Sequence, residues 1–291
     1  MRVLTKQKLI MSRPHIEFIQ SQNLRWQIPS TTYCKKNLKL KVLSVDDNTN
    51  ASTNIIHYPA NYSDSQNYCI ATDEEIFVLQ GQLLINGIEY AEGDYAYLPI
   101  GLNREITASK YGAKVLTFFE GVITKHREKK QTKKPYKNNV IKHISSHKEE
   151  WSSSTDPKLI SKNIRRLELR SDPLTGDATW LLDINQNGMS DSTNRLETHP
   201  VVEECFVLSG ELHMPMGVLT KGAYFWRPAG IQHGPVGTRK GALAIFRSKG
   251  GPLTTTWSKE KHEIQWNQPY KPILPNTLKK HVTMNKKVGT L

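Results

Sequence analysis

The fold of this chain is decided by Glu197-Thr-His199-Pro-Val-Val-Glu203-Glu-Cys-Phe-Val-Leu-Ser-Gly210 and, shortly after it, Gly222-Ala-Tyr-Phe-Trp-Arg-Pro228-Ala-Gly230-Ile-Gln-His233. Alternate side chains of an extended strand point to the same face, so Glu197, His199 and Glu203 can all face one cavity. The Pro-x-Gly turn then presents His233 on a neighbouring strand. Two imidazoles with one or two carboxylates suit a divalent transition ion better than calcium or magnesium. The two segments therefore predict a metal site.

The same segments resemble the two signature motifs of the cupin family. The first motif is roughly His-x-His, three or four residues, Glu, six residues and Gly; the second is Gly, five residues, Pro-x-Gly, two residues and His. The second motif is complete here, whereas Glu197 stands where the first motif begins with His. The resemblance carries over His199, Glu203 and His233 as metal ligands, with Glu197 as a fourth. The sequence pattern Glu-x-His-Pro-x-x-Glu-Glu is most similar to that of the cupin branch related to the cupin half of ChrR-type anti-sigma factors.

An internal repeat sets the domain organisation. Adding 129 to residue numbers in the first half reproduces a carboxylate, a proline and five glycines of the second half without a gap. The matched pairs are Glu74 and Glu203, Gly81 and Gly210, Gly93 and Gly222, Pro99 and Pro228, Gly101 and Gly230, Gly112 and Gly241, and Gly121 and Gly250. Short strands with turn residues between them fill both halves, so we predict an all-β chain with two tandem cupin-type barrels (double-stranded β-helix, or jelly roll), a bicupin.

The repeat also shows that only the second half keeps the ligand set. In the first half, Ile70 stands in place of His199, Tyr68 in place of Glu197 and Arg104 in place of His233, so only Glu74 remains. One carboxylate without an imidazole cannot hold a transition ion tightly. We therefore expect the first barrel to have no metal and Arg104 to pair with Glu74, with anion binding by Arg104 as the alternative.

Four segments follow from this comparison. We predict an N-terminal barrel without metal ligands over residues 1–121, a basic linker over 122–150 and a metal-binding barrel over 151–251. Residues 252–291 carry scattered Trp and Pro with little periodicity, which predicts an extended C-terminal arm. Such an arm would pack on the other barrel or on another subunit, with Trp266 as an anchor.

Residues that differ between the two halves are the best candidates for chemistry. Arg227 falls on Leu98, Phe225 on Ala96 and His213 on Leu84. We expect Arg227 to clamp a substrate carboxylate or enolate, Phe225 to form the wall of the substrate pocket and His213 to belong to the same pocket, behind the ligands. Tyr224 and Trp226 have aromatic counterparts in the first half and are expected to serve packing.

Composition narrows the class of protein and its partners. The 291 residues are 37% hydrophobic, which is typical of a globular protein, and no apolar run approaches the ~18 residues of a membrane span. Three scattered cysteines fit a reducing compartment, so we expect a cytoplasmic protein. The net charge of +13 comes mainly from segments outside the motif-bearing cores, which argues against nucleic-acid binding. We expect a small-molecule substrate and a homodimer.

The predicted ligand set leaves coordination positions open, and an open position is typical of a catalytic site. Fe(II) is the favoured ion, and Mn, Co, Ni and Zn also fit. The leading hypothesis is an Fe(II)-type oxygenase acting on a small oxygenated metabolite such as a hydroxy-ketone or diketone, with Glu197 as an internal base if it leaves the metal. Two alternatives stay open. One is a non-catalytic metal- or ligand-binding regulator, and the other is a non-redox lyase or isomerase.

Overall fold

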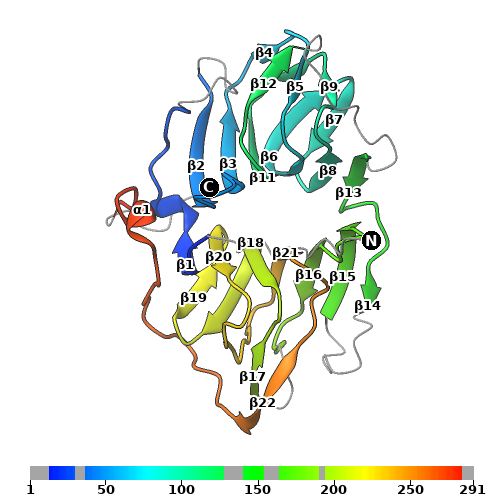
Figure 1. The fold of residues 1–291 in the computed structure, drawn as a ribbon. Coiled ribbons are helices and arrows are strands. Elements are labelled where there is room, and N and C mark those ends of the chain that lie inside the picture. Colours follow the sequence, from blue (N-terminus) through cyan, green and yellow to red (C-terminus); the bar gives the residue numbers. More distant parts are fainter. Residues whose placement is uncertain (1–12, 30–36, 128–139, 154–163, 190–193, 284–291) are drawn as a thin grey trace, which may run out of the picture.

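Strands make up nearly all of the regular structure of the protein. The computed structural model describes residues 13–29, 37–127, 140–153, 164–189 and 194–283. The two halves of the chain form two barrels that lie one above the other in the view of Figure 1. Helical structure in the described ranges is confined to a 3-10 turn, η1 (Ser21–Asn23), and one short helix, α1 (Asn276–Lys279). The predicted all-β bicupin fold is confirmed.

The first barrel is built on a nine-stranded antiparallel sheet. Its main path runs β13-β8-β6-β11-β3-β2, with β4, β7 and β10 attached at the side. The bounds are β2 (Lys39–Val45), β3 (Ser52–Tyr58), β4 (Tyr62–Asp64), β6 (Glu74–Ile85), β7 (Ile88–Ala91), β8 (Asp94–Leu98), β10 (Thr107–Ser109), β11 (Ala113–Phe119) and β13 (Ile141–Ser145). A three-stranded sheet joins β12 (Lys125–Arg127), β5 (Tyr68–Ile70) and β9 (Asn103–Arg104).

The second barrel repeats this order in an eight-stranded sheet. Its path runs β1-β20-β18-β21-β16-β15-β14, with β19 attached to β18. The bounds are β1 (Ile16–Gln20), β14 (Ser152–Ser153), β15 (Ile164–Ser171), β16 (Ala178–Ile184), β18 (Val202–Met214), β19 (Gly217–Thr220), β20 (Ala223–Arg227) and β21 (Ala242–Lys249). A separate pair joins β17 (Arg195–Thr198) and β22 (Thr256–Lys261). The series β20-β18-β21-β16-β15 matches β8-β6-β11-β3-β2, as the 129-residue repeat predicts.

Two short strands cross between the halves and correct the predicted segments. β1 precedes the first barrel in the chain but pairs with β20 of the second. β13 precedes the second barrel but pairs with β8 of the first, and β12 also pairs within the first half. The segment 1–121 therefore contains a strand of the second barrel, and is not the first barrel alone. Part of the expected linker 122–150 forms strands. Lysine-rich segments occur on edge strands as well as in linkers, so composition could not separate the two.

Repeat-related positions meet at the interface between the barrels. The guanidinium carbon of Arg247 lies 4.3 Å from the ring centre of Phe118, and 247 minus 118 is the repeat interval of 129. The same interval separates Glu120 and Lys249, whose Oε2 and Nζ atoms lie 3.1 Å apart. Two like charges at either position would repel each other. The two copies instead carry complementary residues where they meet.

Arg247 is the centre of a buried charge cluster at this interface. Its guanidinium donates hydrogen bonds to Glu75 at 2.9 Å, to Glu120 at 2.6 Å and to Glu204 at 2.9 Å. Burial alone would raise the pKa of Glu75 and of Glu120. The cations beside them, Arg247 for Glu75 and Lys249 with Arg247 for Glu120, hold both pKa values below the ordinary range. The barrels are thus joined by ionised side chains as well as by apolar ones.

Three apolar clusters account for the rest of the packing. One fills the first barrel, one fills part of the second, and a third lies between the two sheets. Tyr224 and Trp226 belong to the cluster between the sheets, together with their counterparts Tyr95 and Tyr97. They serve packing, as predicted, although between the barrels rather than inside one.

In the described residues the C-terminal arm packs on the second barrel and on β1. β22 pairs with β17 of the second barrel, and Ile273 bridges Glu17 on β1. Trp266 packs against His213, with ring centres 5.0 Å apart. The arm therefore braces the second barrel and the crossing strand β1.

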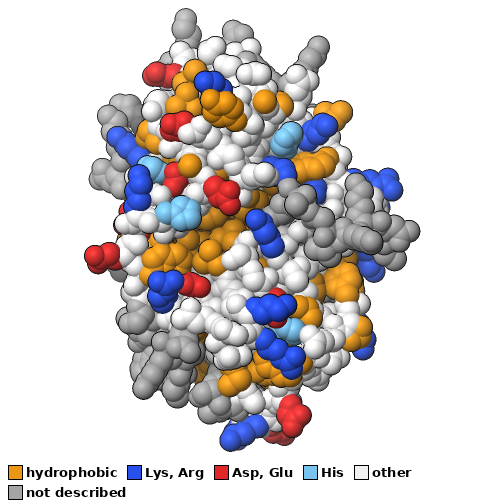
Figure 2. Space-filling view, turned by 180° about the vertical axis from the view of Figure 1, so that it is seen from behind, with side chains coloured by type: hydrophobic (Ala, Val, Ile, Leu, Met, Phe, Trp, Pro, Cys, Tyr) orange, Lys and Arg blue, Asp and Glu red, His pale blue; other side chains and the backbone are white. Residues whose placement is uncertain are grey.

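The described surface bears no single basic face in the view of Figure 2, where Lys and Arg side chains are scattered among acidic and apolar ones. Within the described ranges there is no helix both long and apolar enough to cross a membrane.

Candidate metal centre

Backbone pairing brings the expected ligands together. Glu197 lies on β17 and His233 follows β20, and the two residues exchange both backbone hydrogen bonds, at 2.9 and 3.0 Å. The amide of Gly230 donates to the carbonyl of His199 at 2.8 Å. Gly230 has a positive φ of 84°, which glycine adopts without steric cost. The Pro-x-Gly turn is thereby fastened to the first motif.

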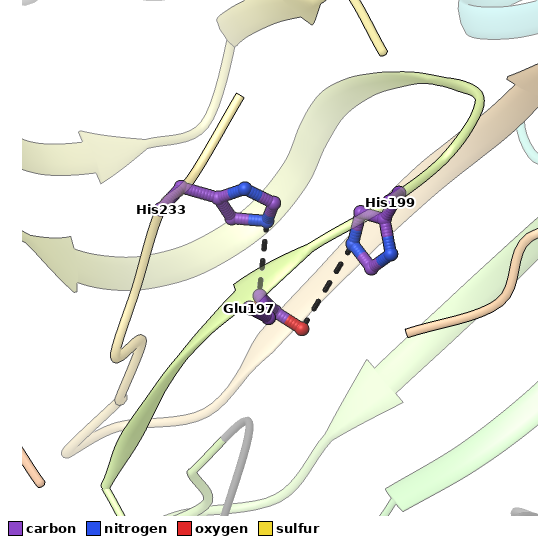
Figure 3. A group of neighbouring side chains, drawn as sticks. All are labelled: Glu197, His199 and His233. Atoms are coloured by element: carbon purple, nitrogen blue, oxygen red, sulfur yellow. Dashed lines mark ion pairs between the residues drawn. The ribbon is translucent and has the colours of Figure 1, made fainter. Parts of the chain in front are cut away.

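Four side chains converge at this point. Glu197, His199 and His233 each offer a ligand atom, and these atoms lie within 4.8 Å of one another. Figure 3 shows both imidazole rings turned toward the Glu197 carboxylate. His233 Nε2 lies 3.5 Å from Glu197 Oε1 and 3.3 Å from Glu203 Oε2. His199 Nε2 lies 3.9 Å from one oxygen of each carboxylate. Glu197, expected as the fourth ligand, is thus central to the group.

The hydrogen bonds of the two rings set their tautomers. His199 Nδ1 donates to the carbonyl of Thr254 and His233 Nδ1 to that of Ile231, both at 3.0 Å. A carbonyl oxygen only accepts, so in each neutral ring Nδ1 carries the proton and Nε2 carries the lone pair. Both Nε2 atoms are buried, and neither makes a well-formed hydrogen bond within the described part of the chain.

These lone pairs face carboxylates, an arrangement that is repulsive without a positive charge between them. A divalent ion with bonds of about 2.1 Å would separate neighbouring donor atoms by about 3.0 to 3.4 Å. The separations between imidazole nitrogens and carboxylate oxygens, 3.3 to 3.9 Å, are close to that range, so small side-chain movements would bring all the donor atoms onto one ion. The donor set therefore fits a transition ion, to be held by His199, His233, Glu197 and Glu203.

Charges around the site agree with this fit. Burial would raise the pKa of Glu203, but His233, Arg227 and His199 hold it well below its usual value. Burial raises the pKa of Glu197. For His233, burial and Arg227 would lower the pKa, yet the Glu203 and Glu197 carboxylates raise it overall. Glu197 and His233 therefore hold a proton more tightly than usual, and a metal would compete with that proton for the same atoms.

A row of charges across three strands fixes Glu203. Arg227 lies opposite Glu203 on the neighbouring strand and donates from Nη1 to Glu203 Oε2 at 2.8 Å. On its other side Arg227 donates from Nε to Glu17 Oε2 at 2.6 Å and from Nη2 to Glu17 Oε1. Arg227 is 2% exposed, so most of its donors are used within the protein. This geometry gives Arg227 a positioning role, and the expected substrate clamp remains a prediction.

Glu17 is the functional residue that sequence reasoning missed. Burial would raise its pKa, but Arg227 lowers it to about 2, so Glu17 is an anion at neutral pH. It lies on β1, roughly 200 positions before Arg227 in the chain, and no motif surrounds it. Only the crossing of β1 to the second barrel brings it to the site.

A cavity of about 200 Å³ lies against the ligands. Glu197, His199, Glu203 and Arg227 line one part of it, and the other walls are aliphatic and aromatic apart from Arg166 and Thr255. Phe225 lies in this wall, at the place predicted for it.

His213 does not join the site. Its Nδ1 accepts a hydrogen bond from the amide of Asn267 at 3.1 Å, and its Nε2 lies 3.2 Å from Glu211 Oε1. Its side chain is outside the cavity lining and packs under the C-terminal arm. The expectation that His213 belongs to the substrate pocket is therefore corrected. The comparison of the two halves singled it out, but its neighbours Leu212 and Met214 line the cavity, so strand alternation turns His213 to the opposite face of β18.

At the equivalent positions, all of which are described, the first barrel carries a different pair of side chains. Glu74 and Arg104 form a buried ion pair, 1% and 2% exposed, inside an apolar core. This confirms the predicted pairing.

Fold and site together define a bicupin with a candidate metal centre in its second barrel. The profile of the family described as Domain of unknown function (DUF4437) matches residues 17–253, so the chain belongs to the DUF4437 family. No curated protein matches it in sequence.

Solved structures share the fold at low sequence identity. A protein from Nostoc punctiforme PCC 73102, provisionally assigned as a dioxygenase, is 16% identical with a TM-score of 0.76, over 87% of this chain and 94% of that one. A variant of Bacillus subtilis oxalate decarboxylase is 11% identical with a TM-score of 0.53, over 82% and 78%. Vicilin from hazelnut, Corylus avellana, is 11% identical with a TM-score of 0.55, over 82% and 87%. These likenesses concern the fold and favour no ChrR-like branch.

Proposed function

We propose that the second barrel binds one divalent transition ion and that the protein is a metal-dependent enzyme, most simply an Fe(II)-type oxygenase acting on a small hydroxy-ketone or diketone. One observation carries the proposal: two buried imidazole lone pairs are held toward two carboxylates beside a cavity. The Nostoc protein with the same fold, described as a dioxygenase, supports the choice of reaction.

The ion and the residues around it would have separate roles in the reaction. When bound, the ion would supply Lewis-acid polarisation of a chelating pair of oxygens and, if it is Fe(II), redox chemistry with dioxygen. Arg227, held by Glu17, keeps Glu203 ionised and in place. Glu197 has a raised pKa, so it is suited to accept and hold a proton. The aromatic walls would exclude water from the reacting end of the ligand.

The cavity limits the size of the substrate. A dry cavity of about 150 Å³ accommodates benzene in another protein. A volume of about 200 Å³ therefore suits a ligand of fewer than about ten non-hydrogen atoms. This is the size of a small hydroxy-ketone, diketone or short oxo acid.

The test is elemental analysis of protein purified without added metal, followed by oxygen-uptake assays with small hydroxy-ketones and diketones. We expect about one ion per chain and metal-dependent oxygen uptake. His233→Ala should remove both with unchanged circular dichroism, whereas the surface variant His143→Ala should change neither. Turnover by wild-type protein stripped of metal would refute the proposal.

The alternatives predict other outcomes of the same assays. A lyase or isomerase would need the ion but consume no oxygen. A regulator, which the ChrR-like wording of the first motif would favour, would bind the ion without turning over any substrate. We also propose that the protein is a cytoplasmic homodimer and that it does not bind nucleic acid. Sedimentation with and without DNA can test the oligomeric state and the absence of nucleic-acid binding.

A further inference from the structure

Arg166 on β15 lines the same cavity as the metal ligands. In the sheet, β15 lies four strands from β20, which carries Arg227, along the path β20-β18-β21-β16-β15. The cavity is therefore bounded by an arginine from each end of this series of strands. The motifs did not point to Arg166, because it precedes them by some 30 residues.

A stack of aromatic rings connects the two arginines. The guanidinium carbon of Arg166 lies 4.3 Å from the ring centre of Trp180. Trp180 stacks on Phe246 at 5.8 Å, and Phe246 meets Phe225 edge-on at 6.3 Å. The guanidinium carbon of Arg227 lies 3.8 Å from the ring centre of Phe225. All five side chains line the cavity.

The two ends of this stack differ in their partners. Arg227 is paired with Glu17 and Glu203. The guanidinium of Arg166 makes no hydrogen bond and no ion pair within the described residues, although the side chain is only partly exposed. Burial lowers its pKa, and Glu168, an exposed neighbour on the same strand, only partly opposes this. As far as the described residues go, Arg166 thus has its donors available, and Trp180 restricts the plane in which they lie.

The first barrel lacks the whole stack. Strand pairing identifies the counterparts, because Trp180 lies opposite Phe246 just as Asn54 lies opposite Thr117. By the same registers, the counterparts of Arg166, Trp180, Phe246, Phe225 and Arg227 are Leu40, Asn54, Thr117, Ala96 and Leu98. Packing of the barrel therefore does not require these residues. These residues occur in the half of the chain that has the metal ligands and the cavity.

We propose that Arg166 binds an anionic group of the substrate, so that the substrate is a small carboxylate that carries its metal-chelating oxygens at the other end. This assignment rests on the proposed function, since it takes the metal to hold the chelating end. A planar guanidinium with several free donors matches a carboxylate in shape and charge. In a wall that is otherwise apolar and aromatic, the negative charge of such a ligand requires a cation nearby.

Two β-diketones that differ by one carboxylate provide the test. Both 2,4-pentanedione and 2,4-dioxopentanoate can chelate an ion, but only the second has a charge for Arg166 to bind. Binding to Co(II)-loaded protein would be followed by the visible absorption of the ion. We expect wild type to prefer 2,4-dioxopentanoate by at least about tenfold, the strength of one charge-assisted hydrogen bond.

Arg166→Met should abolish this preference while leaving the Co(II) content and the affinity for 2,4-pentanedione unchanged. Arg166→Lys should restore part of it. The matched control is Arg165→Met, since Arg165 is the next residue on β15 but pairs with Asp183 at the surface. A preference that persists in Arg166→Met, or that is absent from metal-loaded wild type, would overturn the proposal.

Failure of the proposed function would look different. If wild type takes up no Co(II), the metal proposal fails, and calorimetry with 2,4-dioxopentanoate on the metal-free protein decides the role of Arg166. Weaker binding by Arg166→Met than by wild type would support that role. Equal binding by the two proteins, including no binding by either, would overturn it.

Discussion

The two barrels share one strand order but use their interiors differently. At equivalent positions the first barrel holds the buried pair of Glu74 and Arg104, and the second holds Glu203 and His233 beside a cavity. Both interiors thus contain a carboxylate with a nitrogen-bearing partner. In the first the partner is a permanent cation that closes the interior, whereas in the second it is an imidazole that can exchange a proton for a metal. The comparison shows that the cupin barrel folds with either.

The largest expected effect is a loss of metal, and it should follow when the second barrel is given the residues of the first. His199→Ile with His233→Arg places there the residues found at Ile70 and Arg104. The new arginine can pair with Glu203, so we expect the protein to fold and its metal content to fall from about one ion per chain to none. Elemental analysis and circular dichroism would measure this. Retention of the ion would show that the imidazoles are not its ligands.

The next largest expected effect is a loss of stability at the interface between the two barrels. Arg247→Phe makes position 247 identical to its counterpart Phe118. It removes the cation that the buried Glu75 and Glu204 share with the partly exposed Glu120, which should reduce the free energy of unfolding by about 5 kcal/mol. Urea denaturation would measure the loss.

The pH dependence of stability provides the control for this variant. In wild type the folded pKa values of Glu75 and Glu120 lie below the ordinary 4.5. Their stabilisation is therefore complete above about pH 4.5 and is lost as the pH falls through the lowered values. In Arg247→Phe the contribution of Arg247 is lost, while Arg170 stays beside Glu75 and Lys249 beside Glu120, so both pKa values should rise toward the ordinary value and less stability should be lost as the pH falls. A wild-type slope in the variant would contradict the role assigned to Arg247.

A smaller effect is expected from opening the first barrel. Arg104→Leu removes the cation that pairs with Glu74 and should cost about 3 kcal/mol of stability. Because the two interiors are separate clusters, metal content should stay unchanged. The double variant with Glu74→Leu should recover most of the loss. Loss of the ion in Arg104→Leu would mean that the barrels are coupled.

The smallest effect is expected at His213. His213→Leu inserts its counterpart Leu84 and removes the acceptor of the Asn267 amide, which should cost about 1 kcal/mol. Metal content and ligand affinity should not change, since His213 lies outside the cavity. A lower affinity for 2,4-pentanedione would return His213 to the substrate pocket, where the comparison of the two halves had placed it.

The sequence alone determined the duplication, the strand order and the candidate ligands. Glycines, prolines and ligand residues act through local backbone geometry and fixed spacing, so a repeat of 129 residues exposed them, and the pairing of Glu74 with Arg104 followed from the same alignment. Only the tertiary structure decided which distant segments meet. It brought Glu17 on β1 to Arg227, carried β13 to the first barrel and set Arg166 on Trp180 beside the cavity. Pairing between strands far apart in the chain depends on packing and on which sheet edge is free, and neither leaves a periodic pattern in the residues involved.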